Sequence, residues 1–195
     1  GFWQPITYPW SLLEANELLL RQREKNKRQI AATAKIEKYA TLKGFVDVGK
    51  NSLIRNGAYI EGPVVIGDDC VIGPNCFIRP YTAIGSRCKI GNAVEVKNSI
   101  IMDGTVIGHL SYCGDSVVGS NVNFGAGTII ANLRHDDGNV KSMVKGAVVD
   151  TGRRKFGTII GDNAKTGINT SIYPGRKIWA GKTTLPGEVV KEDVN

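Results

Sequence analysis

Two cationic side chains, Arg79 and Lys97, stand eighteen residues apart, at positions of a repeat where glycine is common. An arginine guanidinium can bind a phosphate through two hydrogen bonds, and a lysine ammonium adds a compact charge. If the fold brings these two side chains together, they could hold a phosphate ester between them. The net charge of +7 agrees with an anionic ligand but does not identify it.

The repeat that would position these cations is a strict six-residue pattern. An aliphatic residue recurs in unbroken phase at Val48, Ile54, Ile60, Ile66, Ile72, Ile78, Ile84, Ile90, Val96 and Met102. This period fits a coil of short strands with a tight turn after each strand and the aliphatic side chain pointing inward. Successive coils would pair through a parallel ladder about 4.8 Å apart and stabilise one another. The sequence therefore predicts an all-β parallel β-helix over residues 44–195.

The predicted coil places the two cations on the same face. If three hexads complete one coil, Arg79 and Lys97 lie on neighbouring rungs, where like charges repel, so an anion is expected beside them. One alternative is Glu61, one coil before Arg79, which would give a simple Glu-Arg-Lys ladder. The other is a bound phosphate, in which case loss of either cation should leave the stability unchanged or raise it.

The six-residue phase shifts after Met102, and His109 falls at the shift. The new phase fits Val106, Tyr112, Val118, Phe124 and Ile130, and it resumes at Ile160, Thr166, Ile172 and Ile178. Residues from about 133 to 157 fit no hexad, and they are polar, basic and too numerous for a turn. We expect this segment to loop out of the coil, where loops on a rigid scaffold often carry function.

Residues 1–43 precede the repeat and have a different pattern. Ser11 is followed three residues later by Glu14, which is the spacing of a capping box at a helix start. Leucines crowd the first turns and basic residues follow, which predicts a linker helix that packs at one end and is solvated at the other. Membrane attachment is not expected, because the charges do not share a face opposite the apolar side chains.

The composition narrows the possible partners and location. No apolar run in the 195 residues has the length of a membrane span, and the coil has few aromatic residues and no nucleic-acid motif. Cys70, Cys76 and Cys88 fall at the small inward position of the repeat without a CxxC pair, so we expect compact core residues rather than metal ligands. A reducing, cytoplasmic location is the corresponding expectation.

Three stretches resemble one known family at matching spacing. They are "PWSLLEANELLL" near the start, "IRPYTAIGSRCKIGNAVEVK" across the cations, and "GHLSYCGDSVVGSNVNFGAGTIIAN" around His109. They are similar to the bifunctional UDP-N-acetylglucosamine pyrophosphorylase/glucosamine-1-phosphate N-acetyltransferase family, especially its archaeal-type members. The resemblance implies a left-handed coil of three hexads per turn, a handedness that periodicity alone does not give. It also leads us to expect that this is the carboxy-terminal acetyltransferase part, following an absent nucleotidyltransferase domain.

The resemblance implies a role for each residue that matches by position. His109 would be the general base that takes a proton from the sugar amine, and Asn132 would orient the acetyl group or the base. The residues implied to hold the sugar phosphate are Arg79, Lys97, Tyr112 and Asn123. The residues implied to contact acetyl-CoA, the co-substrate, are Ala126, Ile168 and Ala180. No metal is expected in this domain.

The chain departs from the bacterial pattern after Asn132. Leu133 stands where the bacterial pattern has tyrosine, and the lysine that follows is displaced by the longer loop. Lys141 or Lys145 could take its role, and we favour Lys141. The last coils are also about one rung short. Candidates for the phosphates of the cofactor are Arg153, Arg154, Lys155, Arg176 and Lys177, a set that could equally form a solvated basic face.

The resemblance thus implies a homotrimeric enzyme that moves acetyl from acetyl-CoA to glucosamine 1-phosphate or galactosamine 1-phosphate and feeds UDP-N-acetylhexosamine synthesis. A γ-type carbonic anhydrase shares the fold but needs three histidine ligands, and the chain has two histidines. The alternative that stays open is a non-catalytic β-helix that serves a nucleotidyltransferase as an oligomerisation or regulatory domain. A third is an acyltransferase for another amino sugar or acyl donor.

Overall fold

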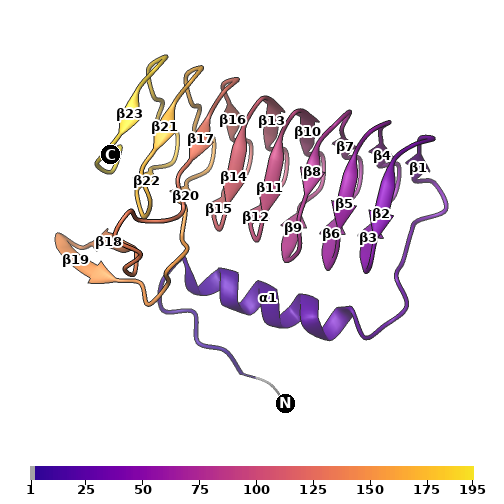
Figure 1. The fold of residues 1–195 in the computed structure, drawn as a ribbon, viewed down its shortest axis with the longest axis horizontal. Coiled ribbons are helices and arrows are strands. Elements are labelled where there is room, and N and C mark those ends of the chain that lie inside the picture. The colour runs from indigo at the N-terminus through magenta and orange to yellow at the C-terminus, as the bar shows by residue number, and fades with distance from the viewer. Residues whose placement is uncertain (1–2) are drawn as a thin grey trace.

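Short parallel strands stack into three sheets in a computed structural model that describes residues 3–195 (Figure 1). The first sheet contains β1 (Lys35–Ile36), β4 (Leu53–Ile54), β7 (Val71–Ile72), β10 (Lys89–Asn92), β13 (Val106–His109) and β16 (Asn123–Phe124). The second contains β2 (Thr41–Lys43), β5 (Tyr59–Glu61), β8 (Phe77–Ile78), β11 (Glu95–Lys97), β14 (Tyr112–Gly114), β17 (Ile129–Ile130), β21 (Ser171–Ile172) and β23 (Val189–Val190). The third contains β3 (Val46–Val48), β6 (Val64–Ile66), β9 (Thr82–Ile84), β12 (Ile100–Ile101), β15 (Val117–Val118), β20 (Ile159–Ile160) and β22 (Lys177–Ile178). The predicted β-helix is confirmed, and its handedness stays a prediction.

The inward hexad positions form a continuous aliphatic core. Ile54, Ile72 and Ile90 pair in register across the first sheet, and each is 0% exposed. Each side chain packs on its counterpart one coil away, so truncating one would open a cavity between two rungs. The six-residue pattern is confirmed up to Val96, which is also buried.

The coil shortens at one corner, which is the corner between the second and third sheets. From Val96 to Ile101 and from Cys113 to Val118, successive buried residues are five apart instead of six. The register shows the same change, because Val96 pairs with Cys113, seventeen residues on rather than eighteen. Two successive coils therefore lack one residue at the same corner.

The predicted phase after Met102 is wrong at its first two positions. Ile107 and Cys113 point inward with 0% exposure, whereas Val106 and Tyr112 are partly exposed. His109 lies at the corner between the first and second sheets, where the six-residue spacing is unbroken. The missing residues are therefore at a different corner from the one that holds His109.

The helix α1 (Ser11–Arg23) lies along the outer face of the third sheet (Figure 1). Leu13 is fully buried near its start. The side-chain amide of Asn16 donates to the carbonyl of Tyr81 at 2.9 Å, and near the other end Arg23 pairs with the buried Asp47 of β3 at 2.6 Å. The helix is thus fastened along its length, and not at one end as predicted.

The predicted capping box does not form. Trp10 is the N-cap residue and no side chain caps the helix, because Ser11 already lies in the first turn. The Ser11 hydroxyl accepts a hydrogen bond from the backbone N–H of Tyr8 at 3.4 Å. Glu14 pairs with Arg153 at 3.5 Å, so it links the helix to the inserted segment.

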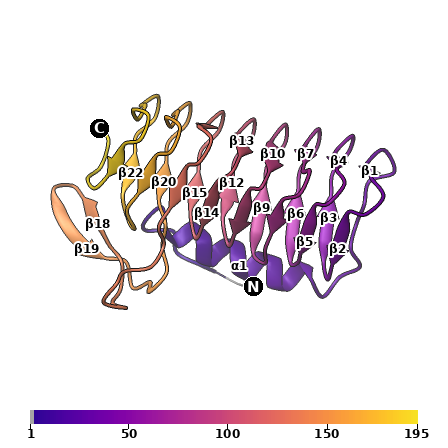
Figure 2. The same cartoon turned by 45° about the horizontal axis from the view of Figure 1, so that its top comes forward.

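The inserted segment carries an antiparallel hairpin of β18 (Lys141–Val144) and β19 (Ala147–Asp150), which projects from the coil near the start of α1 (Figure 2). A bridge between Leu133 and Lys155 closes the base of the insertion. Trp10, Val140 and Phe156 form a second buried cluster with the outer side of the third sheet. This cluster fixes the insertion against the residues that begin the helix.

The β-helix was predicted to begin at residue 44, but the first coil starts earlier. Ile30 bridges Val48, and β1 and β2 already pair with β4 and β5. Across residues 3–195, no helix combines the length and apolar character needed to cross a bilayer. No three side chains of His, Cys, Asp or Glu gather as metal ligands would in this described part.

The burial of the cysteines gives a direct test of the inward register. Cys70, Cys76, Cys88 and Cys113 are all free and buried, and burial raises the pKa of Cys76 and of Cys113 to about 12. Because all four thiols are buried from the reagent, and because the reactive thiolate form is further disfavoured at Cys76 and Cys113, the native protein should react slowly with a chromogenic disulfide reagent. All four thiols should react at once in denaturant. Rapid release of four equivalents without denaturant would contradict this register.

Candidate functional site

His109 ends β13 and lies exposed at the corner that leads into the second sheet. Its carbonyl accepts a hydrogen bond from the N–H of Gly127 at 3.3 Å, and the carbonyl of Ala126 accepts one from Asn169 at 2.8 Å. These ladder bonds place His109, Ala126 and Ile168 at equivalent corner positions of three successive coils. The predicted base and two predicted acetyl-CoA contacts therefore line one edge of the molecule.

Arg79 directly follows β8, and Lys97 ends the paired strand β11, so the two cations lie on adjacent rungs of the second sheet. Each cation has its own carboxylate. The guanidinium of Arg79 pairs with Glu95 at 2.8 Å, and the ammonium of Lys97 pairs with Asp115 at 3.3 Å. The protein itself thus supplies the anions that the stacked cations require.

The ladder with Glu61 that the sequence allowed does not form. Glu61 pairs instead with Lys43 one coil earlier, at 3.1 Å. The guanidinium of Arg79 lies over the ring of Phe77, 5.5 Å from its centroid.

The two ion pairs of the second sheet differ in burial. The side chains of Arg79 and Glu95 are 38% and 35% exposed, whereas Lys97 is 21% exposed and Asp115 only 4%. An exposed pair contributes little to stability and can open at small cost. A buried carboxylate depends on its partners, because losing one leaves a charge without compensation. Arg79 is therefore the cation that is free to meet a ligand.

Asp115 binds two of the predicted site residues directly and a third through one of them. Its Oδ2 accepts hydrogen bonds from Lys97 and, at 2.5 Å, from the side-chain amide of Asn132. The same amide nitrogen lies 3.0 Å from the Tyr112 hydroxyl. Burial, with smaller contributions from Asp115 and Glu95, raises the pKa of Tyr112, so its hydroxyl stays protonated at neutral pH.

Glu95 and Asp115 are absent from the sequence prediction. Glu95 stands two residues before Lys97 on the same strand, so strand alternation puts both side chains on the outer face. That spacing was an available signal. Asp115 lies beyond the end of β14, eighteen residues after Lys97, so the one-coil spacing that links Arg79 to Lys97 was an available signal for it too.

Asn123 and Lys141 do not join this cluster. Asn123 is exposed at the start of β16 in the first sheet, where it pairs with Val106 and Lys165. Lys141 begins β18, and its carbonyl accepts a hydrogen bond from Arg176 at 2.9 Å. Its exposed side chain belongs to the hairpin.

Ala180 also lies away from the His109 edge. It follows β22 in the third sheet, against the backbone of Gly161. The corner position after Ile168 belongs to Pro186, because the N–H of Gly187 donates to the Ile168 carbonyl at 2.7 Å. The structure thus separates Ala180 from the other two predicted acetyl-CoA contacts.

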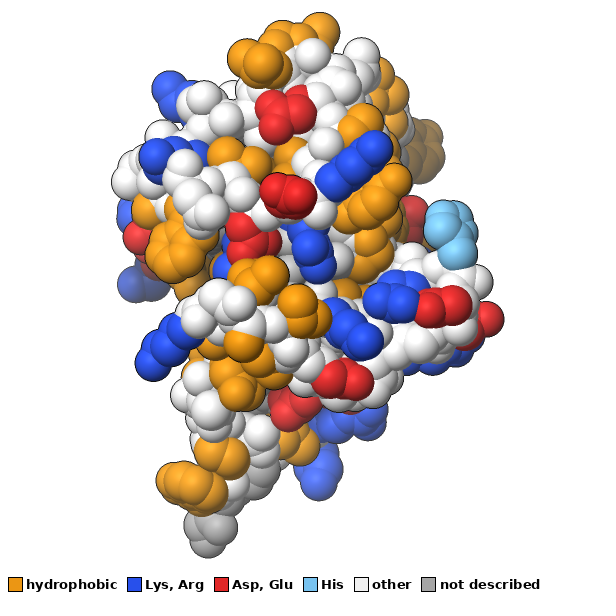
Figure 3. Space-filling model, turned by 90° about the vertical axis from the view of Figure 1, so that its left-hand side faces the viewer, with side chains coloured by type: hydrophobic (Ala, Val, Ile, Leu, Met, Phe, Trp, Pro, Cys, Tyr) orange, Lys and Arg blue, Asp and Glu red, His pale blue; other side chains and the backbone are white. Residues whose placement is uncertain are grey.

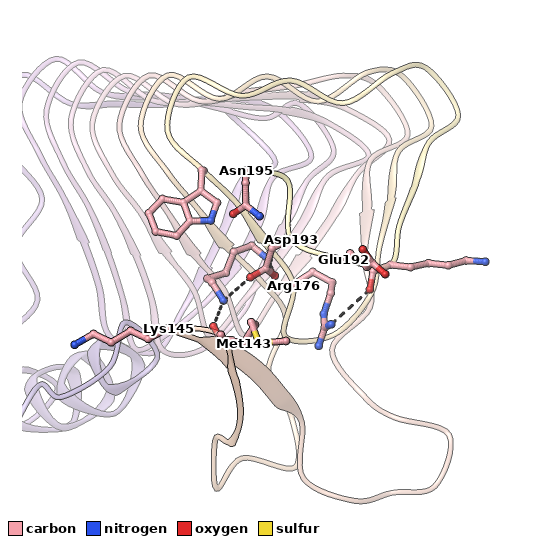
Figure 4. Close-up of a pocket in the computed structure, with 10 residues that line it drawn as sticks. Met143, Lys145, Arg176, Glu192, Asp193 and Asn195 are labelled. Carbon is pink, nitrogen blue, oxygen red and sulfur yellow. Dashed lines mark hydrogen bonds and ion pairs between the residues drawn. The ribbon is translucent and has the colours of Figure 1, made fainter.

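A cleft of about 700 Å³ lies between the hairpin and the last coil (Figure 4). Figure 3 faces this end of the coil, where basic and acidic side chains are interspersed. Two of the cations predicted for the phosphates of the cofactor line the cleft, but Lys177 pairs with Asp193 at 2.7 Å and Arg176 donates to the hairpin backbone. Lys145, in the turn of the hairpin, also lines the cleft (Figure 4). Arg176 and Lys177 thus hold the hairpin against the coil.

Two of the remaining three predicted cations have partners within the insertion or the helix. Arg153 pairs with Glu14 at 3.5 Å, and Arg154 pairs with Asp137 at 2.6 Å. Lys155 forms the backbone bridge that closes the insertion. Arg154 and Lys155 are both exposed, and the carboxylate that pairs with Arg154 is itself 64% exposed.

Comparison with known proteins places this geometry in context. Residues 60–174 match the family model described as the GMPPB C-terminal domain. The chain is 46% identical over its full length to the bifunctional sugar-1-phosphate nucleotidylyltransferase/acetyltransferase of Sulfurisphaera tokodaii, covering 47% of that protein. It is 44% identical over 95% of its length to the bifunctional protein GlmU of Methanocaldococcus jannaschii, covering 45%. It therefore spans about half the length of these relatives.

A solved UDP-N-acetylglucosamine acyltransferase from Campylobacter jejuni aligns with 83% of this chain and 69% of its own, at 16% identity and a TM-score of 0.48. The fold assignment here depends on the strand pairing of the chain itself and not on this alignment.

The unequal burial of the two ion pairs predicts unequal effects on stability. Lys97→Ala should lower the free energy of unfolding by about 1.5–3 kcal/mol, because a buried carboxylate loses a charged partner. Arg79→Ala should change it by less than about 1 kcal/mol, since its pair is exposed. This replaces the expectation that either loss leaves the fold unaffected. Urea unfolding of both variants measures the difference, and equal effects would contradict the assignment.

Proposed function

This chain belongs to the GMPPB C-terminal domain family and is a homologue of bifunctional sugar-1-phosphate nucleotidylyltransferase/acetyltransferases, and we propose that it transfers acetyl from acetyl-CoA to the amine of an amino-sugar 1-phosphate. The observation that carries the proposal is the cluster along β11, β14 and β17, in which Asp115 binds Lys97 and Asn132, and Asn132 binds Tyr112. The sugar phosphate is glucosamine 1-phosphate or its galactosamine counterpart. The product feeds UDP-N-acetylhexosamine synthesis.

In the proposed reaction, the imidazole of His109 accepts a proton from the sugar amine as the amine attacks the thioester carbonyl. The nitrogen–carbon bond forms and the carbon–sulfur bond breaks. The proton passes from His109 to the departing thiolate, so coenzyme A leaves as a thiol. A histidine suits this role because its side chain titrates near neutrality, where an amine can still be deprotonated.

The phosphate of the sugar would be held on the second sheet. Arg79 can leave the exposed Glu95 and grip the phosphate with two hydrogen bonds, while Lys97 adds charge from its fixed position beside Asp115. The protonated hydroxyl of Tyr112 can donate to the same phosphate. Asn123 and Lys141 lie apart from this cluster within one chain, and they complete the site if a second copy brings them to it.

Acetyl-CoA would lie along the edge that bears His109, in contact with Ala126 and Ile168. The thioester then meets the amine beside the imidazole. Ala180 lies off this edge, so Pro186 is the better candidate for the contact one coil further on. Because the chain has four buried free thiols, we propose a reducing, cytoplasmic setting for the reaction.

The open side of this edge favours assembly into a homotrimer with sites between copies. Apolar side chains follow the same edge with large exposed fractions, namely Leu110 at 61%, Ile168 at 54% and Leu185 at 72%. Several exposed apolar side chains along one edge are typical of a contact surface. A neighbouring copy would cover it and enclose His109.

The alternative function is a non-catalytic β-helix that only assembles or regulates a nucleotidyltransferase. The test is thiol release from acetyl-CoA, measured side by side with glucosamine 1-phosphate and galactosamine 1-phosphate. Thiol release that depends on either sugar phosphate supports the enzymatic function. The better substrate of the two identifies the preferred orientation of the hydroxyl that distinguishes them. No release with either sugar would favour the alternative.

Replacing the proposed base should remove most of the activity. His109→Ala should lower acetyl transfer by roughly 10²–10⁴-fold, the range for loss of a general base, with little change in melting temperature because the side chain is exposed. His135→Ala, at the other histidine, is the matched control and should retain wild-type turnover. Near-normal turnover of His109→Ala would exclude this histidine from the mechanism.

The trimer can be tested by light scattering on the purified chain. We expect about three times the mass of one 21.0 kDa chain. Leu110→Glu, which places a charge on the apolar edge, should shift the mass toward the monomer and reduce activity in parallel. An active, stable monomer of the unmodified chain would contradict the prediction.

A further inference from the structure

We propose that Asp115 is a positioning residue that fixes the orientation of the Asn132 amide and holds Lys97 in place, an inference that rests on the proposed acetyl transfer for its effect on rate. Asp115 itself would touch neither substrate. Its side chain is 4% exposed, and it acts through the neighbours that line the open face of the second sheet.

Both oxygens of the Asp115 carboxylate accept hydrogen bonds from side chains of the protein. Its Oδ1 accepts from the side-chain amide of Asn98 at 2.7 Å, and its Oδ2 accepts from Lys97 at 3.3 Å and from Asn132 at 2.5 Å. A buried carboxylate with three donors has one stable orientation. It therefore acts as a rigid anchor for the two side chains that reach toward the substrate.

The hydrogen bond to Asp115 determines which groups the Asn132 side chain can bind. A carboxylate only accepts hydrogen bonds, so the nitrogen of the Asn132 amide, and not its oxygen, must face Asp115. The same nitrogen lies at hydrogen-bond distance from the Tyr112 hydroxyl, which uses the second of its two hydrogens. The Oδ1 of Asn132 is left for a ligand, and an oxygen can only accept. Asn132 can thus hold an N–H group, such as that of the sugar amine or of an imidazole, and cannot stabilise an oxyanion.

The backbone does not require a charge at this position. Asp115 has φ of 52°, in the left-handed region, and Asn98 occupies the same corner one coil earlier with φ of 44°. Aspartate and asparagine both tolerate this conformation. Asp115→Asn is therefore compatible with the backbone. A flip of the Asn98 amide, whose Oδ1 is buried with no partner, would let it accept from the new amide.

The kinetic test compares Asp115→Ala with Asp115→Asn and with a matched control, Asp47→Ala. Asp47 is also a buried, ion-paired carboxylate, bound to Arg23 at 2.6 Å, but it lies in β3, in the first coil. Both alanine variants should lower the melting temperature. Only Asp115→Ala should lower kcat, by roughly 10–100-fold, as when a group that orients an active-site ligand is lost. Asp115→Asn should recover part of that loss, because one oxygen still accepts from Asn132.

A spectroscopic test is independent of activity. The two side-chain amide protons of Asn132 should be well separated in chemical shift and exchange slowly with solvent in the wild-type protein. Asp115→Ala should bring them together and speed their exchange at least tenfold, whereas Asp47→Ala should leave them unchanged. Unaltered Asn132 protons in Asp115→Ala, or an equal loss of kcat in Asp47→Ala, would overturn the proposal. If the wild-type protein releases no thiol with either sugar phosphate, the proposed function fails, while these protons still decide whether Asp115 holds Asn132.

Discussion

The parallel register of the coil is the constraint on which the rest of the structure depends. Each residue has a counterpart one rung away, so a side chain is placed by the residue above and the residue below it. This rule stacks the aliphatic core, aligns the His109 corner with Ala126 and Ile168, and sets Arg79 beside Lys97. A feature on one rung therefore acts on its neighbours, and a site can be assembled from residues far apart along the chain.

The departures from this regularity gather at a single corner. Between the second and third sheets, the coil loses one residue after β11 and again after β14, and after β17 the long insertion leaves it. Lys97, Asp115 and Asn132 all lie where these second-sheet strands end. The shortening sets the left-handed positions of Asn98 and Asp115 opposite each other, so that their side chains bond directly. The irregular corner thus builds the polar cluster, while the regular corner presents the histidine.

Burial divides the charges of this cluster into two kinds. Lys97 and Asp115 are screened from solvent and hold the structure together, whereas Arg79 and Glu95 are exposed enough to exchange partners. A dianion that approaches the second sheet would therefore meet one fixed cation and one mobile cation. The same distinction explains why the two predicted cations at the start of β22 are poor candidates for an open anion site. Arg176 and Lys177 are already bound to the hairpin and to the last strand segment.

The sequence by itself determined the coil, the inward aliphatic positions, the buried cysteines, the helix before the coil and the existence of the insertion. These features follow from the local periodicity of the sequence, which can be recognised without knowing which residues lie on the neighbouring rungs. The sequence did not determine which corner is short, so the phase assigned to Val106 and Tyr112 is wrong, while Ile107 and Cys113 form the core. A five-residue step is visible only when rungs are paired, because either side of the gap fits a hexad. Only the tertiary structure showed that Arg79 pairs with Glu95 and not with Glu61, which lies at the one-coil spacing, because the direction of the side chains across neighbouring rungs chooses between the two carboxylates.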